Sequence, residues 1–208
     1  MVQELDSSSA TGAAVQPAKV ALLDAAERLL IEVGYAGVTT RRVAEEAGVN
    51  HGLVHYYFGS MEELYFQVLE RFADRLAVLL RALYEDPNLT FLEKWRAGAR
   101  FFQEQPTAAF PKILLELSAM SWNNPPLQAR IMAVHAEFRA VFHEHIGPTL
   151  REYGLDEDRC PLPAVIALLT SYQLGSIVER LSGVDAGHAE LAAAIDRWLA
   201  ELDAGVAR

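Results

Sequence analysis

The sequence predicts an all-α protein of about nine helices, with a three-helix N-terminal head joined to a larger C-terminal helical bundle. Apolar residues recur every three or four positions along most of the chain, which is the helical period. No segment alternates polar and apolar residues as a half-buried strand does. A chain of 208 residues is close to the size at which one core gives way to two. We therefore expect a flexible tail (residues 1–17), a head (18–64) and a body (65–208).

Composition and charge limit the classes of function. With 51% hydrophobic and 22% charged residues, the chain has the composition of a folded protein. Its formal charge of -10 repels nucleic acid, so any binding of DNA requires a local surface. The single cysteine, Cys160, has no partner for an internal disulfide and indicates a reducing, cytoplasmic location. The acidic and serine-rich first residues lack the apolar core of a secretion signal.

The head begins with a helix predicted from about Ala18 to Val33, ended by Gly34. A second helix of about two turns follows Thr39, which is placed as its N-cap, and stops at Gly48. Asn50 is placed to cap a short third helix. The residues expected to face inward on these two helices are Val43, Ala44, Ala47, Val54 and Phe58. A helix, a glycine-containing turn and a second helix form the order of the helix-turn-helix motif.

The body begins where Ser60 and Glu63 form a Ser-x-x-Glu capping box for a long fourth helix. Further helices follow after residue 86, and Pro148 is expected to bend or stop one of them. The segment from Cys160 to Val178 has no charged residue and approaches the length of a bilayer span. Its prolines, hydroxyl residues, glutamine and glycine dilute its hydrophobicity, so we expect a buried helix covered on more than one side and no membrane.

The stretch from Gly34 to Leu64 carries a specific resemblance. It reads GYAGVTTRRVAEEAGVNHGLVHYYFGSMEEL and closely resembles the signature of TetR/AcrR-type transcriptional regulators. The resemblance covers the head and the order and lengths of the later helices. It implies a sequence-specific DNA-binding regulator, a ligand-responsive repressor, whose body holds a small molecule and forms a homodimer. In this mechanism the ligand shifts the fourth helix and changes the spacing of the two heads.

The DNA-contacting residues are expected on the outward side of the second and third helices. Side-chain amide, imidazole and apolar groups suit base edges, and hydroxyl and cationic groups suit phosphates. The second helix also offers its positive N-terminus to a phosphate. The predicted residues are Thr39, Thr40, Arg41, Arg42, Asn50, His51, Gly52, Leu53, His55, Tyr56 and Tyr57. Two symmetric heads imply a near-palindromic operator in double-stranded DNA.

The body is expected to bind an apolar or amphipathic effector, because its helical stripes carry large side chains and no Lys or Arg. The predicted lining residues are Trp95, Phe102, Phe110, Leu114, Trp122, His135, Phe138, Phe142 and Tyr172. His135 and His145 lie ten residues apart and form no metal pair, so neither metal nor cofactor is expected. The last two helices are the expected dimer interface, through small residues such as Ala164, Ala167, Ser171 and Gly175 and the anchor Trp198.

Two other functional classes are an enzyme and a ligand-binding protein without a role on DNA. An enzyme would need a phosphate loop, a nucleophile elbow or a zinc motif, and the sequence contains none of these patterns. The second alternative is a helical protein that binds a small molecule and has no role on DNA. This alternative stays open because acidic residues outnumber basic ones between Ala18 and Leu64.

Overall fold

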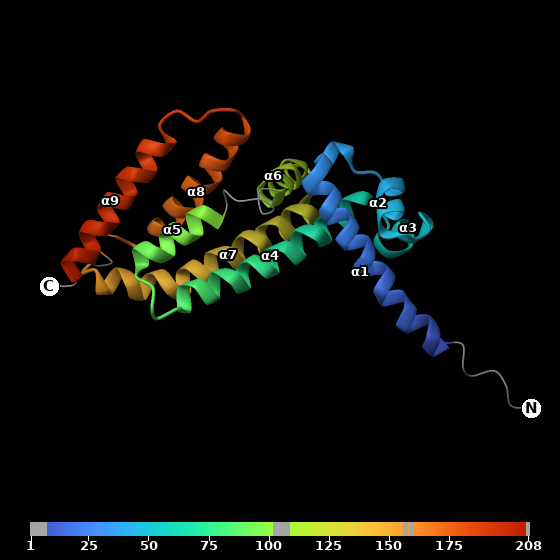
Figure 1. Ribbon diagram of the computed structural model, residues 1–208, viewed down its shortest axis with the longest axis horizontal. Helices are drawn as coiled ribbons and strands as arrows, with labels where there is room; N and C mark the ends of the chain where they lie inside the picture. The colour runs from blue at the N-terminus through green and yellow to red at the C-terminus, as the bar shows by residue number, and fades with distance from the viewer. Residues whose placement is uncertain (1–7, 102–108, 156–157, 159, 207–208) are drawn as a thin grey trace, which may run out of the picture. The chain divides into compact units, whose positions relative to one another are not determined.

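The computed structural model describes residues 8–101, 109–155, 158 and 160–206, and these form nine α-helices and one 3-10 turn without a strand (Figure 1). The predicted all-α class is confirmed. The elements are α1 (Ser8–Val33), η1 (Tyr35–Gly37), α2 (Thr40–Ala47), α3 (Gly52–Phe58), α4 (Met61–Glu85), α5 (Phe91–Phe101), α6 (Ala109–Ser121), α7 (Pro125–Glu152), α8 (Leu162–Leu181) and α9 (His188–Val206).

The chain divides into two compact units. The N-terminal unit comprises residues 1–72 and 108–117, and the C-terminal unit comprises residues 73–107 and 118–208. The division falls inside α4, whose first half belongs to the N-terminal unit and whose second half belongs to the other. One continuous helix therefore contributes to both cores.

Helix α1 begins at Ser8, ten residues ahead of its predicted start near Ala18. The segment lacks an apolar stripe, so periodicity gave no reason to extend the helix. Its alanines have the highest intrinsic helix propensity, and this favours a helix without any packing. Pro17 lies inside α1 and donates no backbone hydrogen bond there.

The predicted helix ends at Thr39, Gly48 and Ser60 are present. Thr39 Oγ1 accepts a hydrogen bond from the Arg42 N–H at 3.3 Å, and Gly48 ends α2 in the left-handed conformation at φ 66°. Ser60 Oγ accepts from the Glu63 N–H at 3.1 Å at the start of α4. A capping box that the sequence analysis missed starts α5. There Thr90 and Glu93 each accept from the backbone N–H of the other.

The core of the N-terminal unit joins α1 to the two short helices and to the start of α4. Its buried residues include Leu22, Ala26, Val43, Val54, Phe58, Leu64 and Phe66. Arg71 of α4 donates to Asp24 and to Glu27 of α1, both at 2.6 Å. Tyr65 donates its hydroxyl to the Val38 carbonyl at 3.0 Å. These contacts join α4 to α1 and to the turn that precedes α2.

In the C-terminal unit, the second half of α4 lies beside α7 (Figure 1), and Tyr84 packs edge-on against Phe142 with ring centroids 6.0 Å apart. Phe142, Ile146 and Ile166 form a buried cluster of α7 and α8. Pro148 does not stop α7, which continues to Glu152. Glu144 and Pro148 are both exposed, so water can bind the Glu144 carbonyl, to which a proline nitrogen donates no hydrogen bond.

The expectation that α8 is a buried helix is wrong for the single chain. Only Ile166 and Ser176 of α8 are buried, and Leu168 is 69% exposed. Within the described part of the chain, α8 is also the one helix long and apolar enough to cross a membrane by length and composition, with a mean hydropathy of 1.3. Periodicity could not reveal this exposure, because a helix that is apolar all round has no distinct inward face.

Candidate nucleic-acid interface and ligand pocket

The start of α2 presents a capped helix N-terminus at the surface. Thr39 has extended backbone geometry (φ -129°, ψ 157°), and its hydroxyl oxygen accepts from the third residue of the helix. The Thr39 O–H remains a donor, and the first-turn N–H groups have no partner inside a helix. Together they form a local donor set for a phosphate oxygen.

The turn between α2 and α3 is closed by backbone hydrogen bonds. Gly48 N–H donates to the Glu45 carbonyl at 3.1 Å, and Val49 N–H donates to the Ala44 carbonyl at 3.0 Å. Asn50 Oδ1 accepts from the Gly52 N–H at 2.8 Å, but the N-cap of α3 is His51 and not Asn50 as predicted. A Cβ added at Gly52 would lie only 3.2 Å from that oxygen. Asn50 is exposed, so its amide N–H₂ is accessible at the surface.

All eleven residues predicted to contact DNA are at least partly accessible. Val54 and Phe58 face the core, so the remaining side chains of α3 face away from it. Tyr56 is 72% exposed, and its ring contacts Tyr57 edge-on at 5.0 Å. The exposed members are Thr39, Arg41, Arg42, Asn50, His51, Gly52, His55 and Tyr56, and the half-buried members are Thr40, Leu53 and Tyr57.

A groove of about 540 Å³ brings several of these residues together. It lies between the first turns of α2 and the start of α3, and four predicted residues line it: Thr40, Arg41, Asn50 and His51. Glu45 also lines the groove and was not predicted. Its carboxylate accepts from Arg41 Nε at 2.7 Å, and this hydrogen bond raises the pKa of Arg41 above its ordinary value.

The two arginines of α2 are held differently. Arg42 Nη1 donates to the Gly37 carbonyl at 2.8 Å, so this guanidinium also secures the turn before α2. Arg41 pairs with Glu45, but the two side chains are 85% and 59% exposed. An ion pair as exposed as this contributes little to stability, so exchange of Glu45 for a phosphate costs little.

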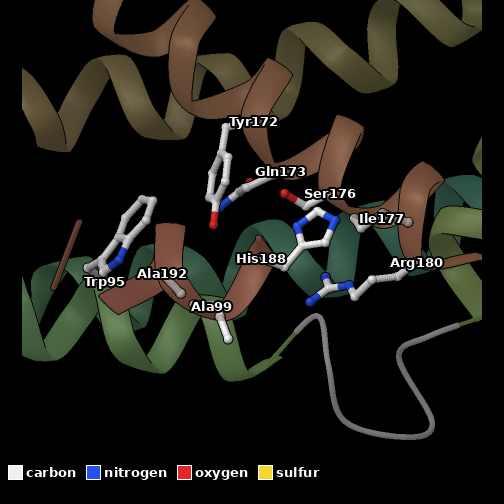
Figure 2. Close-up of a pocket in the computed structure, with 10 residues that line it drawn as sticks. Trp95, Ala99, Tyr172, Gln173, Ser176, Ile177, Arg180, His188 and Ala192 are labelled. Atoms are coloured by element: carbon white, nitrogen blue, oxygen red, sulfur yellow. The ribbon is translucent and has the colours of Figure 1, made fainter. Parts of the chain in front are cut away.

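The predicted ligand residues do not form one cavity. Trp95 and Tyr172 do come together, because they line a pocket of about 260 Å³ formed by α5, α8 and α9 in the C-terminal unit (Figure 2). Their rings are nearly parallel, with centroids 6.4 Å apart. Both were predicted to line a ligand site, whereas Arg180 and His188, which line the same pocket, were not predicted. No helical stripe carried either of them.

The other predicted ligand residues have different surroundings. Phe110 stacks on Phe72 at 4.8 Å and is buried with Leu114 in the core of the N-terminal unit. Phe142 is buried in the cluster of α7 and α8, and Trp122 is 76% exposed. Phe138 and His135 are half-buried on α7, and burial together with Arg139 lowers the pKa of His135. Phe102 lies outside the described residues.

Residues 22–68 match the family model for "Bacterial regulatory proteins, tetR family". Residues 22–68 are therefore similar to the tetR family. A regulator named BetI 2 from Chromohalobacter salexigens is 32% identical over 111 residues, which are 51% of this chain and 53% of that protein. RutR from Escherichia coli K12 is 38% identical over 98 residues, 46% of each chain. Both are HTH-type transcriptional regulators, and the chain spans about half the length of these curated relatives.

Solved structures extend the similarity of fold beyond the head. A putative transcriptional regulator from a Rhodococcus species superposes with a TM-score of 0.71 over 89% of this chain and 95% of that chain, at 21% identity. A putative TetR-family regulator from Mesorhizobium loti superposes with a TM-score of 0.68 over 93% and 96%, at 17% identity. The fold of the helical body is therefore similar to the fold of these structures, at low sequence identity.

Proposed function

We propose that the chain is a sequence-specific DNA-binding transcriptional regulator of the cytoplasm, a repressor that responds to a small amphipathic effector. In this proposal residues 18–64 read DNA, and residues 65–208 bind the effector and form the dimer. The observation that carries it is the division of α3 into two sides. Val54 and Phe58 fix the helix to the core, while His51, His55 and Tyr56 stand free at the surface.

In the proposed complex, α3 lies in the major groove. The Asn50 amide and the His51 imidazole reach base edges, and Leu53 contacts a thymine methyl group. Gly52 allows the backbone to approach closely. The phosphates on either side are held by the N-terminus of α2, with Thr39, Thr40 and Arg41, and by His55, Tyr56 and Tyr57. Arg42, which secures Gly37, supplies charge to the same surface.

The homodimer is proposed to form through α8 and α9. Exposed residues on α8 follow one another at intervals of three and four and therefore share one face. They are Ala164, Leu168, Ser171, Gly175 and Val178. The small members permit close approach of a second helix, and Leu191 and Trp198 add exposed apolar area on α9. A second copy removes this surface from water, and its two-fold symmetry presents two heads to a near-palindromic operator.

A membrane is the other environment that an apolar α8 suits by length. The same helix carries Gln173, Glu179 and Arg180, and its inner side is built into the cluster of Phe142 and Ile166. A second copy leaves these groups in contact with water and protein, so we favour the dimer. Leu168→Glu is expected to convert the dimer to a monomer in analytical ultracentrifugation, while Glu190→Gln on α9 leaves it intact. A Leu168→Glu protein that remains a dimer, or wild type that partitions into lipid vesicles, contradicts this proposal.

The alternative is a small-molecule-binding protein without a role on DNA. Glu45 in the groove and the net charge of -10 favour it, because both oppose the approach of phosphates. The test is selection of duplexes from a random DNA library by the full chain, together with a gel shift on the region upstream of its own gene. The regulator proposal expects a near-palindromic consensus whose binding weakens with salt.

A point variant ties the binding to α3. His51→Ala is expected to weaken operator binding by about 5- to 150-fold, the range for one base-edge contact. His143→Ala, which removes an exposed histidine of α7, is the matched control and is expected to bind as wild type does. If no sequence is enriched, or if the two variants behave alike, the alternative is preferred.

A further inference from the structure

The pocket between α5, α8 and α9 has two chemically different ends (Figure 2). Trp95 of α5 and Tyr172 of α8 lie at one end, and Arg180 of α8 and His188 of α9 lie at the other. Ile177 and alanines of α5 and α9 complete the wall. A volume of about 260 Å³ suits a molecule of one or two rings, just below the usual range for drug-sized ligands.

The aromatic end offers broad apolar surface. The planes of Trp95 and Tyr172 are inclined by only 21° with centroids 6.4 Å apart, so no ring fits between them. They act as one wall, against which a planar group packs by a face or an edge. The Tyr172 hydroxyl points into the open space beside them.

The other end carries the positive charge of Arg180, and the Glu179 carboxylate lies close to the neighbouring His188. Within the described residues, no carboxylate is paired with Arg180, whose guanidinium points into the pocket (Figure 2). Arg96 on α5 is different, since Asp196 of α9 accepts from both of its nitrogens at 2.6 and 2.7 Å. This second pair holds α9 against α5, and Arg180 is left to bind something that the chain does not supply.

His188 adds a second polar group at the same end. Its Nε2 atom is buried and makes no hydrogen bond in the described structure, although Glu179 Oε2 lies 2.9 Å away. The pair is close but misaligned for a ring N–H. Buried polar atoms in folded proteins are nearly always hydrogen-bonded, so this nitrogen is available to a ligand atom in the pocket as well as to Glu179. Ser176 lies next to it in the wall and offers a hydroxyl.

We propose that this pocket binds a small planar aromatic monocarboxylate, with its ring on Trp95 and Tyr172 and its carboxylate on Arg180 and His188. Arginine presents a planar fork of donors that matches a carboxylate, and such charge-assisted bonds are the strong ones. The assignment of this ligand as the effector rests on the proposed regulator function. The pocket itself lies within the C-terminal unit and requires no DNA.

The test uses full-length wild-type protein and two pairs of probes in isothermal titration calorimetry: benzoate with benzamide, and 2-naphthoate with 2-naphthamide. Each amide keeps the ring and removes the charge. At least one acid is expected to bind about tenfold or more tightly than its amide, as loss of a charge-assisted hydrogen bond predicts. Failure of both acids to bind at millimolar concentration, or equal binding of acid and amide, overturns the proposal.

Variants then locate the site. Arg180→Gln is expected to weaken acid binding at least about tenfold, and Arg197→Gln, which removes an exposed arginine of α9, is the matched control. Trp95→Ala is expected to weaken binding of acid and amide alike, with exposed Trp122→Ala as its control. An unchanged affinity in Arg180→Gln overturns the proposal. Circular dichroism verifies folding, and the acid-to-amide ratio in wild type does not depend on any variant.

Operator binding is measured on the same preparations. Protein that binds its selected DNA but neither acid refutes the pocket assignment and leaves the regulator proposal intact. Protein that binds an acid through Arg180 but enriches no DNA supports the pocket and refutes the regulator proposal.

Discussion

Helices α3 and α8 differ in how far the single chain buries their apolar side chains. In α3, seven residues suffice to place two apolar side chains in the core and to leave the polar and aromatic ones outside. In α8, twenty mostly apolar residues leave only Ile166 and Ser176 buried. The exposed polar and aromatic groups of α3 suit a partner bound through hydrogen bonds. The exposed apolar groups of α8 suit a partner with an apolar surface. Exposure alone therefore does not identify a function, but the chemistry of what is exposed does.

The largest expected effect tests whether α3 really has two sides. Phe58→Ala removes a ring that is 5% exposed, and it is expected to lower the free energy of unfolding by about 3–5 kcal/mol. Tyr56→Ala removes a ring that is 72% exposed, two residues away on the same helix, and is expected to change stability by about 0.5 kcal/mol or less. Urea unfolding followed by circular dichroism measures both.

The same two variants separate stability from DNA binding. Tyr56→Ala is expected to weaken operator binding while the fold is kept, because its ring is placed to reach phosphates. Equal loss of stability in the two variants would mean that Tyr56 packs against protein, and the distinction between the two sides of α3 would fail.

The second prediction concerns the loss of stability at alkaline pH, to which one buried tyrosine in each unit contributes. Burial raises the pKa of Tyr65 in the N-terminal unit, and of Tyr84 in the C-terminal unit, to about 12. A raised folded pKa means that the folded state holds the phenol proton more tightly than the unfolded chain does. The stabilisation is complete below pH ~10 and is lost as pH rises through about 12. For Tyr84, a shift of this size corresponds to about 2–3 kcal/mol.

Phenylalanine variants show which unit causes the loss of stability at alkaline pH. Tyr84→Phe is expected to flatten the fall in stability between pH ~10 and ~12 with little change at neutral pH. Tyr65→Phe also loses the hydrogen bond to Val38 and is expected to cost about 1 kcal/mol at neutral pH. Chemical unfolding across this pH range gives both values. If neither variant changes the alkaline slope, the two phenols are not buried in the folded state as described.

The difference between the units also explains what could be predicted from the sequence. The head was predicted well because its determinants are local: Thr39 caps α2, Gly48 takes a left-handed conformation, and Val54 and Phe58 share one face. The body was predicted only as helices, because its pocket depends on contacts between α5, α8 and α9 that are far apart along the chain. Arg180 was not predicted as a pocket residue because it follows the apolar run of α8. His188 was not predicted because it begins a new helix, α9.

The smallest expected effect concerns the cap that starts the reading surface. Thr39→Ala removes the acceptor of the Arg42 N–H and is expected to cost about 1 kcal/mol, whereas Thr39→Ser keeps that acceptor and most of the stability. The hydroxyl is also a proposed phosphate donor, so operator affinity should fall more for alanine than for serine. A Thr39→Ala protein with wild-type operator affinity and reduced stability would mean that Thr39 only caps α2. The phosphate would then be bound by Thr40 and Arg41. Unfolding and anisotropy titrations on the three proteins decide between these roles, because a cap stabilises the free protein whereas a phosphate contact appears only in the complex.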